Sequence, residues 1–202
     1  MKSGNLTGRR GRPRAFDTAE ALDQAMQVFW EKGYEGASLA DLTESMGVNR
    51  PSLYAAFGGK EELFRKVLDR YDEGPSSFVR EALEEPNARA VVQRLLHGAA
   101  EMHTDPRTPR GCLMVHGALS SGAGADSIRR ELNARRAAAE TVLRKRLVRA
   151  KADGDLPTDA NPADLARYVM TIVRGMAVQA TGGASRAELL RVVRMALRAW
   201  PE

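Results

Sequence analysis

The segment Ser38-Leu-Ala-Asp-Leu-Thr-Glu-Ser-Met-Gly-Val-Asn-Arg-Pro-Ser-Leu-Tyr-Ala-Ala-Phe57 decides the fold of the first part of the chain. Ser38 and Asn49 each precede a short amphipathic stretch, and both are residue types that cap helix N-termini. Gly47 separates the two stretches, so the spacing predicts two short helices joined by a tight turn. Pro51 is compatible with the second helix, because an amide in the first helical turn has no partner within the helix.

The second of these predicted helices has an apolar side and a polar side. Leu53 and Phe57 face inward, whereas Arg50, Ser52 and Tyr54 point outward. A helix of this kind fits the major groove of B-DNA, and the residues near its N-terminus reach the base edges. The pattern therefore predicts a helix-turn-helix, with an ordinary helical hairpin as the alternative.

Each polar residue of this region has a DNA contact that suits its chemistry. Arg50 is expected to read a guanine, because its guanidinium can bond two base acceptors at once. Asn49 and Ser52 suit bases or phosphates, and the Tyr54 hydroxyl suits a backbone phosphate. Lys60 begins the next predicted helix, where a cation beside free backbone amides favours a phosphate.

The residues around this segment resemble the DNA-binding head of the TetR/AcrR family of bacterial regulators. The resemblance lies in Gly33-Tyr34, Ser38-Leu39-Ala40-Asp41-Leu42, Gly47-Val48, Ser52-Leu53-Tyr54, Phe57 and Lys60-Glu61-Glu62-Leu63-Phe64. It implies a homodimer of two all-α domains, in which the C-terminal body binds a small molecule and the last two helices dimerise. By position, it also implies that Ser38, Tyr54 and Lys60 hold phosphates, and that Arg50 and Ser52 approach bases.

A basic arm precedes the predicted head. Residues 1–14 carry five basic residues and no acidic residue, so they account for the whole formal net charge of +5. Within them, Arg10-Gly11-Arg12-Pro13 resembles the core of an A/T-hook, which lays two arginines into a narrow, electronegative minor groove. We therefore expect Arg10 and Arg12 to follow the minor groove beside the operator. A solubilising tail and a contact with anionic membranes are the alternatives.

The composition limits the other possibilities. Hydrophobic residues make up 43% and charged residues 28% of the chain, a balance that supports a globular core. No apolar run reaches the ~18–20 residues of a membrane span, and the N-terminus lacks a secretory apolar stretch, so we expect a cytoplasmic protein without membrane contact. The single cysteine, Cys112, excludes an internal disulfide.

The aromatic residues divide the chain in two. Nine of the eleven fall between Phe16 and Phe78, which predicts a basic flexible arm (1–15), a helix-turn-helix DNA-binding domain (16–74) and a ligand-binding and dimerisation domain (75–202). Strand patterns are nearly absent, so the expected fold class is all-α, with a three-helix head and a helical C-terminal domain. The helices expected in the C-terminal domain cover residues 76–84, 88–104, 111–121, 126–152, 162–182 and 186–200.

The last two predicted helices carry apolar seams that suit pairing with a second copy of the chain. The residues of these seams are Leu165, Val169, Ile172, Met176, Leu189, Val193, Ala196 and Trp200. A two-fold partner would bury them in a four-helix bundle and set two recognition helices one DNA turn apart. The alternative is that the seams close the core of the monomer.

Candidate ligand-binding residues lie in the middle of the chain and comprise Met102, His103, Cys112 and His116. Cys112 and His116 are four residues apart and share a predicted helical face, and their segment resembles a pocket-lining helix of some TetR/AcrR regulators. A thiol near a helix N-terminus beside a histidine can have a depressed pKa and react with electrophiles, whereas the commoner role is a small buried hydrophobe. A metal site made of Cys112, His116 and His103 lacks close ligand pairs at a recurrent spacing, so we expect neither a metal nor a cofactor.

Together these features predict a DNA-binding transcriptional regulator, a repressor that a small-molecule inducer releases from a palindromic double-stranded operator. A ligand-independent architectural DNA-binding protein is the alternative. An enzyme is not expected, because the sequence lacks GxSxG and HExxH, and Gly58-Gly59-Lys60 lacks the spacing of a phosphate-binding loop.

Overall fold

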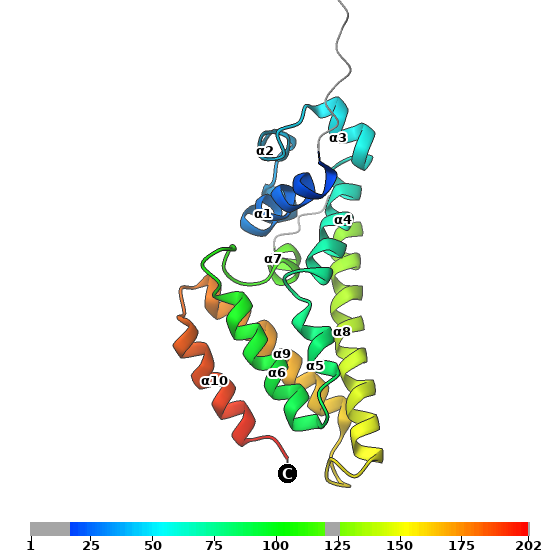
Figure 1. Cartoon of the computed structure of the whole chain (residues 1–202), viewed down its shortest axis with the longest axis vertical. Helices are drawn as coiled ribbons and strands as arrows, with labels where there is room; N and C mark the ends of the chain where they lie inside the picture. Colours follow the sequence, from blue (N-terminus) through cyan, green and yellow to red (C-terminus); the bar gives the residue numbers. More distant parts are fainter. Residues whose placement is uncertain (1–16, 120–125, 202) are drawn as a thin grey trace, which may run out of the picture.

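A computed structural model describes residues 17–119 and 126–201, and within these ranges it contains ten α-helices and no strand. The all-α fold class is therefore confirmed. Helices α1 to α3 gather at one end of the molecule, and α4 leads from them toward a larger helical body (Figure 1). None of the helices in the described ranges combines the length and the apolar character that a membrane span requires.

Helix α1 (Thr18–Gly36) is capped by Asp17, whose carboxylate accepts a hydrogen bond from the Ala19 amide at 2.8 Å. The helix is kinked at Gly33, and a further helical turn follows this residue. Gly33 has a φ of 70°, which glycine adopts without the steric penalty of a Cβ.

Helices α2 (Leu39–Ser45) and α3 (Arg50–Phe57) form the predicted helix-turn-helix. Ser38 and Asn49 cap them as expected, and Gly47 turns the chain between them with a φ of 63°. Leu53 and Phe57 are buried, so the apolar side of α3 is anchored in the core of the head.

Aromatic side chains fill the space between α1 and α4 (Lys60–Glu73). The Phe29 and Phe64 rings meet edge to face at 4.8 Å between centroids, and the Trp30 and Tyr71 rings do so at 4.9 Å. This geometry is the one that aromatic quadrupoles favour. The concentration of aromatic residues seen in the sequence thus corresponds to one packed core.

The body consists of α5 (Phe78–Leu83), α6 (Ala88–His103), α7 (Leu113–Leu119), α8 (Asp126–Ala152), α9 (Pro162–Thr181) and α10 (Arg186–Arg198). These helices agree with the predicted ones apart from their ends. The described ends differ by two residues at most. Helix α7, for example, begins at Leu113 rather than at residue 111, while its predicted end at residue 121 lies outside the described residues.

Head and body share part of their core. Leu113 of α7 and Ile128 and Leu132 of α8 are fully buried against the apolar cluster of the head. Figure 1 shows α7 directly below α1, with α8 running past α4 along the length of the body. A displacement within the body can therefore reach the head through packed side chains.

Candidate functional site: a nucleic-acid interface and a cavity

The outer side of α3 is the first candidate site. Arg50 is exposed and makes no hydrogen bond or ion pair with the described part of the chain. Tyr54 follows one turn later with half of its surface exposed, although large apolar side chains are usually covered. Both side chains are therefore available to a partner, as the sequence predicts for a recognition helix.

Ser38 and Asn49 are already engaged in helix capping. The Ser38 hydroxyl donates to the Asp41 carboxylate at 2.7 Å and accepts from the Asp41 amide at 3.1 Å. The Asn49 side-chain oxygen accepts from the Ser52 amide at 2.9 Å, which leaves its NH₂ group as the donor. The Ser38 hydroxyl can donate a hydrogen bond to a phosphate only if it gives up its hydrogen bond to the Asp41 carboxylate.

Asp41 is held in its charged form. Lys32 donates to its carboxylate at 2.6 Å, and this bond, with those from Ser38, holds the pKa of Asp41 well below its usual range. The resulting cluster of Lys32, Ser38 and Asp41 joins α1 to the start of α2. It fixes the orientation of the helix-turn-helix on the first helix.

Lys60 lies at the start of α4, with its ammonium 4.6 Å above the centre of the Tyr34 ring. Burial lowers the pKa of Lys60, and the charge of Glu35 partly opposes this shift. No side chain caps the first turn of α4, where Gly59 is the N-cap residue. A phosphate would therefore meet a positioned cation and backbone amides that no side chain covers. The other predicted contacts, Arg10 and Arg12, lie outside the described residues.

The predicted dimer seams prove to be part of the protomer core. Six of their eight residues are buried within the single chain: Val169, Met176, Leu189, Val193, Ala196 and Trp200. Leu165 and Ile172 are partly buried and pack against the same cluster. The burial of these side chains agrees with the alternative that the seams close the monomer core, and it leaves the seams little surface for a partner chain. A sequence period cannot tell which neighbour covers an apolar face.

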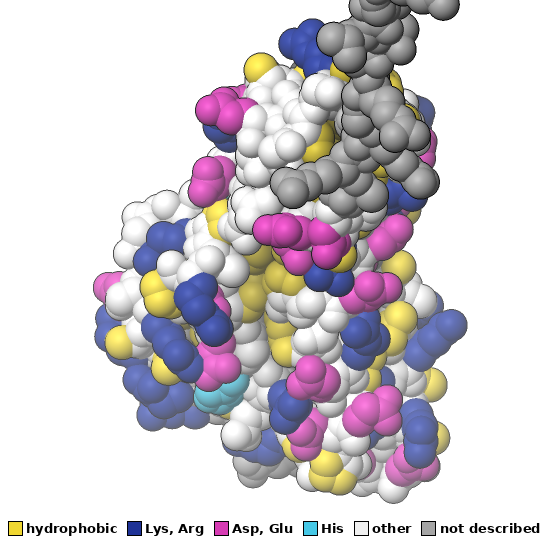
Figure 2. Space-filling view, turned by 45° about the horizontal axis from the view of Figure 1, so that its top comes forward, with side chains coloured by type: hydrophobic (Ala, Val, Ile, Leu, Met, Phe, Trp, Pro, Cys, Tyr) yellow, Lys and Arg dark blue, Asp and Glu magenta, His cyan; other side chains and the backbone are white. Residues whose placement is uncertain are grey.

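The same two helices also carry exposed apolar residues beside the buried seam. Tyr168 and Val178 of α9 are 39% and 49% exposed, and Val192 and Met195 of α10 are 41% and 68% exposed. Val192 and Met195 are three residues apart and share one face of α10. Tyr168 and Val178 are ten residues apart, which sets them about 80° apart around α9. The space-filling view shows that basic, acidic and apolar side chains are mixed over the visible surface of the body (Figure 2).

A half-open cavity of about 360 Å³ lies in the body and is lined by residues from α4 to α9. Met102, His103 and Cys112 line it together, as the sequence suggests for a ligand site. His103 is buried, and its two ring nitrogens lie 3.1 and 3.2 Å from the carbonyl oxygens of Gly111 and Val173. Burial lowers the pKa of His103, whereas the two carbonyl oxygens oppose this shift. A neutral ring has one N–H group and can donate to only one of these oxygens, in α9 or in the loop before α7.

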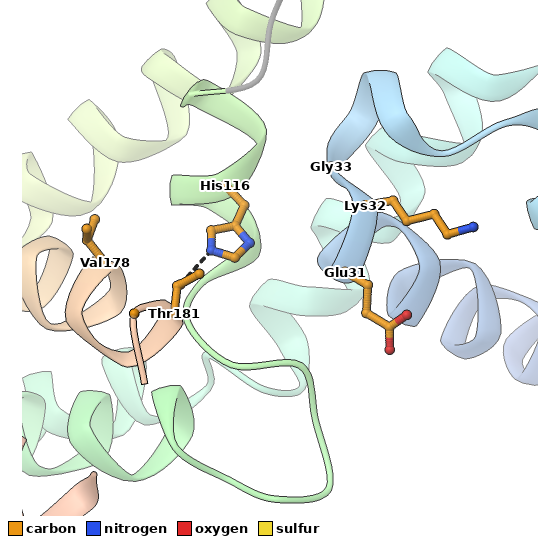
Figure 3. Close-up of a pocket in the computed structure, with 7 residues that line it drawn as sticks. Glu31, Lys32, Gly33, His116, Val178 and Thr181 are labelled. Atoms are coloured by element: carbon orange, nitrogen blue, oxygen red, sulfur yellow. Dashed lines mark hydrogen bonds between the residues drawn. The ribbon is translucent and has the colours of Figure 1, made fainter. Parts of the chain in front are cut away.

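His116 does not join the cavity. Its ring lies in a separate crevice beside Glu31, Lys32 and Gly33 of α1, where Nε2 is 2.7 Å from the Thr181 hydroxyl (Figure 3). Nδ1 is 3.3 Å from the carbonyl oxygen of Trp30. His116 thus links α7 to both α1 and α9, and the sequence spacing alone could not show that it faces away from the cavity of the body.

Cys112 has a partner that the sequence did not indicate. Its Sγ atom is 3.3 Å from the hydroxyl of Tyr71, which is itself buried. Burial raises the pKa of the Cys112 thiol more than the nearby hydrogen bonds lower it. The raised pKa keeps the thiol protonated at neutral pH and favours the commoner role, a small buried hydrophobe, over the reactive thiol. In the described part of the chain, no group of three or more His, Cys, Asp or Glu residues is arranged to hold a metal ion.

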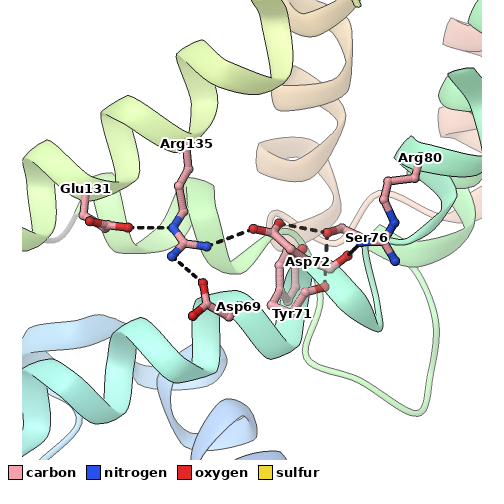
Figure 4. A network of polar contacts seen from close by, with 7 residues as sticks. All are labelled: Asp69, Tyr71, Asp72, Ser76, Arg80, Glu131 and Arg135. Atoms are coloured by element: carbon pink, nitrogen blue, oxygen red, sulfur yellow. Dashed lines mark hydrogen bonds and ion pairs between the residues drawn. The ribbon is translucent and has the colours of Figure 1, made fainter. Parts of the chain in front are cut away.

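An ion-pair network crosses from α8 to α4 beside the cavity. The Arg135 guanidinium donates to Asp69 at 2.6 Å, to Asp72 at 3.0 Å and to Glu131 at 2.8 Å (Figure 4). The sequence analysis missed this network, because α8 carries many arginines and nothing in their spacing distinguishes Arg135 from the others.

The fold and the exposed side of α3 define the class of this protein as a helix-turn-helix DNA-binding protein with a C-terminal helical domain. The family model described as bacterial regulatory proteins, tetR family, matches residues 21–67, and the model described as tetracyclin repressor-like, C-terminal domain, matches residues 86–196. The chain belongs to the TetR family of bacterial transcriptional regulators. It is therefore a transcription regulator and not an enzyme, as the sequence predicts.

Individual relatives agree with this assignment. The chain is 37% identical to the HTH-type transcriptional repressor ComR of Escherichia coli K12, over 96% of this chain and 93% of ComR. A solved structure of the TetR family regulator CifR, a cysteine mutant complexed with a 26-base-pair double-strand operator DNA, matches with 46% identity and a TM-score of 0.90, over 94% of this chain and 100% of that chain. A TetR regulator from Rhodococcus is 41% identical with a TM-score of 0.62, over 92% of this chain and 100% of that chain.

Proposed function

We propose that this protein is a repressor that binds a palindromic operator as a homodimer in the cytoplasm and releases it when a small molecule fills the cavity of the body. The observation that carries the proposal is the exposed pair Arg50 and Tyr54 on an α3 helix that Leu53 and Phe57 anchor. The similarity to CifR, a structure of which contains operator DNA, supports the same use of this helix.

The geometry supports the following proposed contacts with DNA. Arg50, at the first position of α3, would read a base edge in the major groove, and Ser52 lies beside it. Tyr54 and Lys60, with the start of α4, would hold the phosphates on either side. Ser38 and Asn49 would contribute mainly by capping and orienting α2 and α3. Arg10 and Arg12 would add minor-groove contacts from the arm.

Dimerisation would use the exposed sides of α9 and α10. Tyr168, Val178, Val192 and Met195 are large apolar residues that a single chain leaves in water. A second copy related by a two-fold axis would bury them, because such an interface uses the same surface of both chains. This face replaces the seam that the sequence analysis selected.

Selection of bound sequences from a random pool of DNA duplexes tests the proposal. An enriched inverted repeat is expected, because each protomer would read one half-site. An architectural DNA-binding protein, the alternative, would enrich no sequence. A preference for a single, non-repeated site would contradict the dimeric arrangement.

A further inference from the structure

The cavity in the body combines an apolar wall with an excess of positive charge. Among the described residues that line it, four are arginines and one, Asp72, is acidic. The apolar part of the wall includes Phe78, Met102, Val142 and Val173. An occupant that satisfies both parts must be apolar over most of its surface and must carry a group that accepts hydrogen bonds from arginine.

Two of the four arginines are already engaged at their guanidinium groups. Arg135 is paired with the three carboxylates of the network in Figure 4. Arg80 donates to the backbone carbonyl oxygens of Asp72 and Glu73. These contacts leave Arg136 and Arg174 as the arginines that can recognise a ligand.

Arg136 has no carboxylate within ion-pair distance in the described part of the chain. Its guanidinium donates to the carbonyl oxygen of Met114 at 3.0 Å and to the side chain of Asn133, both of which are neutral acceptors. Burial lowers the pKa of Arg136, and the neighbouring charge of Arg174 lowers it further. The site therefore holds a half-buried cation whose charge is not neutralised.

Arg174 is also incompletely satisfied. Its Nη2 atom donates to the carbonyl oxygen of Arg136 at 3.0 Å, and its Nη1 atom lies 3.5 Å from a carboxylate oxygen of Glu140. Glu140 is shared with Arg167 at 3.3 Å, so one acid serves two arginines. The Nε atom of Arg174 is buried without a hydrogen-bond partner, and a buried donor without an acceptor is costly.

We propose that the cavity binds a compact apolar carboxylate, such as a medium-chain or aromatic acid, with its carboxylate at Arg136 and Arg174. Arginine and carboxylate match in charge and in planar geometry. The cavity volume of about 360 Å³ is near the lower end of the range for small-molecule sites, roughly 300–1,000 Å³, which favours a small acid. The apolar part of the ligand would lie against Phe78 and Val142.

This inference rests on the proposed function and specifies its inducer. Tyr71 and Asp72 belong to α4, the helix that connects head and body, and both line the cavity. A carboxylate in the cavity therefore lies beside the residues through which the head is attached. Binding of the acid can bias the position of α4 if the acid binds more tightly to one arrangement of head and body than to another.

Isothermal titration calorimetry of the full-length chain with octanoate and octan-1-ol tests the proposal, because the two probes differ in the carboxylate and share the apolar tail. We expect one octanoate per chain and an affinity for octanol at least tenfold weaker. Arg136→Gln and Arg174→Gln should each weaken octanoate binding at least tenfold and leave octanol binding unchanged. Arg144→Gln, on the exposed side of the same helix α8, is the matched control and should change neither.

Two further variants separate loss of recognition from loss of folding. Arg136→Lys keeps the charge and should retain part of the preference for octanoate. Ala139→Phe introduces a large side chain into the cavity wall and should weaken both probes while the circular dichroism spectrum stays helical. Equal affinity for acid and alcohol, or octanoate binding that Arg136→Gln does not weaken, would overturn the proposal.

Absence of binding across butanoate, hexanoate, octanoate, decanoate and benzoate would overturn it as well. Operator binding without any added acid is measured in parallel on the same preparations. A chain that binds its inverted repeat but none of these acids keeps the proposed function and loses this inference. A chain that binds octanoate but no operator keeps this inference about the cavity and loses the proposed function.

Discussion

The Arg135 Nη1 atom of α8 lies 3.0 Å from the Asp72 carboxylate of α4, and this ion pair ties the longest helix of the body to the helix that ends the head. The same guanidinium also binds Asp69 and Glu131, so three carboxylates share one positive charge. Burial raises the pKa of Asp72, and Arg135 is the main group that opposes this shift. The ion pair with Arg135 therefore stabilises the negative charge of Asp72, which burial alone would disfavour.

Arg135→Ala should destabilise the chain by about 1–2 kcal/mol at pH 7, because Asp72 would remain partly buried without its cation. The loss should be smaller near pH 5. A carboxyl whose folded pKa is raised binds a proton more readily in the folded state, so it lowers stability as the pH rises through that pKa. Urea unfolding followed by circular dichroism at both pH values measures this. Arg144→Ala is the exposed control, and an equal loss at both pH values would contradict the role of Asp72.

Arg50 and Tyr54 should affect DNA binding in different ways. Arg50→Ala should lower affinity for the operator by about 1–3 kcal/mol and relax the preference at one base pair. Tyr54→Phe removes only a hydroxyl and should weaken binding to all duplexes equally, because phosphate contacts carry no sequence information. Fluorescence anisotropy with operator and scrambled duplexes measures both effects. The control Arg144→Ala, on α8 and away from α3, should bind both duplexes with the affinity of the wild-type chain.

Deletion of residues 2–14 removes five positive charges. If Arg10 and Arg12 contact DNA, the affinity should fall and the slope of log K against log salt should become less steep, since fewer counterions are released. Operator titrations between low and moderate salt measure the slope. An unchanged slope would show that the arm does not contact DNA and would favour the solubilising tail. Recruitment of the full-length chain to anionic liposomes by the arm would favour the membrane alternative.

Met195 and Val193 lie two residues apart on α10 but should respond differently to substitution. Met195 is 68% exposed, whereas Val193 is fully buried. Met195→Glu should give a folded monomer with weakened operator binding, because only the proposed dimer face acquires a charge. Val193→Glu should unfold the body, because a carboxylate would enter the protomer core. Sedimentation velocity and circular dichroism distinguish the two outcomes, and a dimer that survives Met195→Glu would reject this face.

Cys112 should react slowly with iodoacetamide at pH 7, because its raised pKa keeps the thiol protonated and Tyr71 covers it. The rate of alkylation should rise only above the pH range in which a free cysteine thiol ionises. Stability should fall over the same range, since a thiol with a raised folded pKa favours the folded state only while it is protonated. The modified fraction, followed by mass spectrometry, checks this, with Cys112→Ser as the blank. Rapid alkylation at pH 7 would restore the reactive-thiol interpretation.

Local patterns were sufficient for the helix-turn-helix. Asp17, Ser38, Asn49 and Asn161 cap the helices that follow them, because a side-chain oxygen satisfies amides only a few residues away. The Gly47 turn and the inward positions of Leu53 and Phe57 depend on equally short distances along the chain. The sequence therefore determined the helices, the recognition helix and the family.

Tertiary packing decided the rest. The period of Val169, Val193 and Trp200 marks an apolar face, but only the packed chain shows that this face is covered by its own protomer. The positions of His116, Cys112 and Arg135 likewise depend on helices that are distant in sequence, since each meets α1, α4 or α9 across the fold. A sequence period specifies the side of a helix on which a residue lies, whereas the neighbour that covers it and the pKa that results are properties of the whole packed chain.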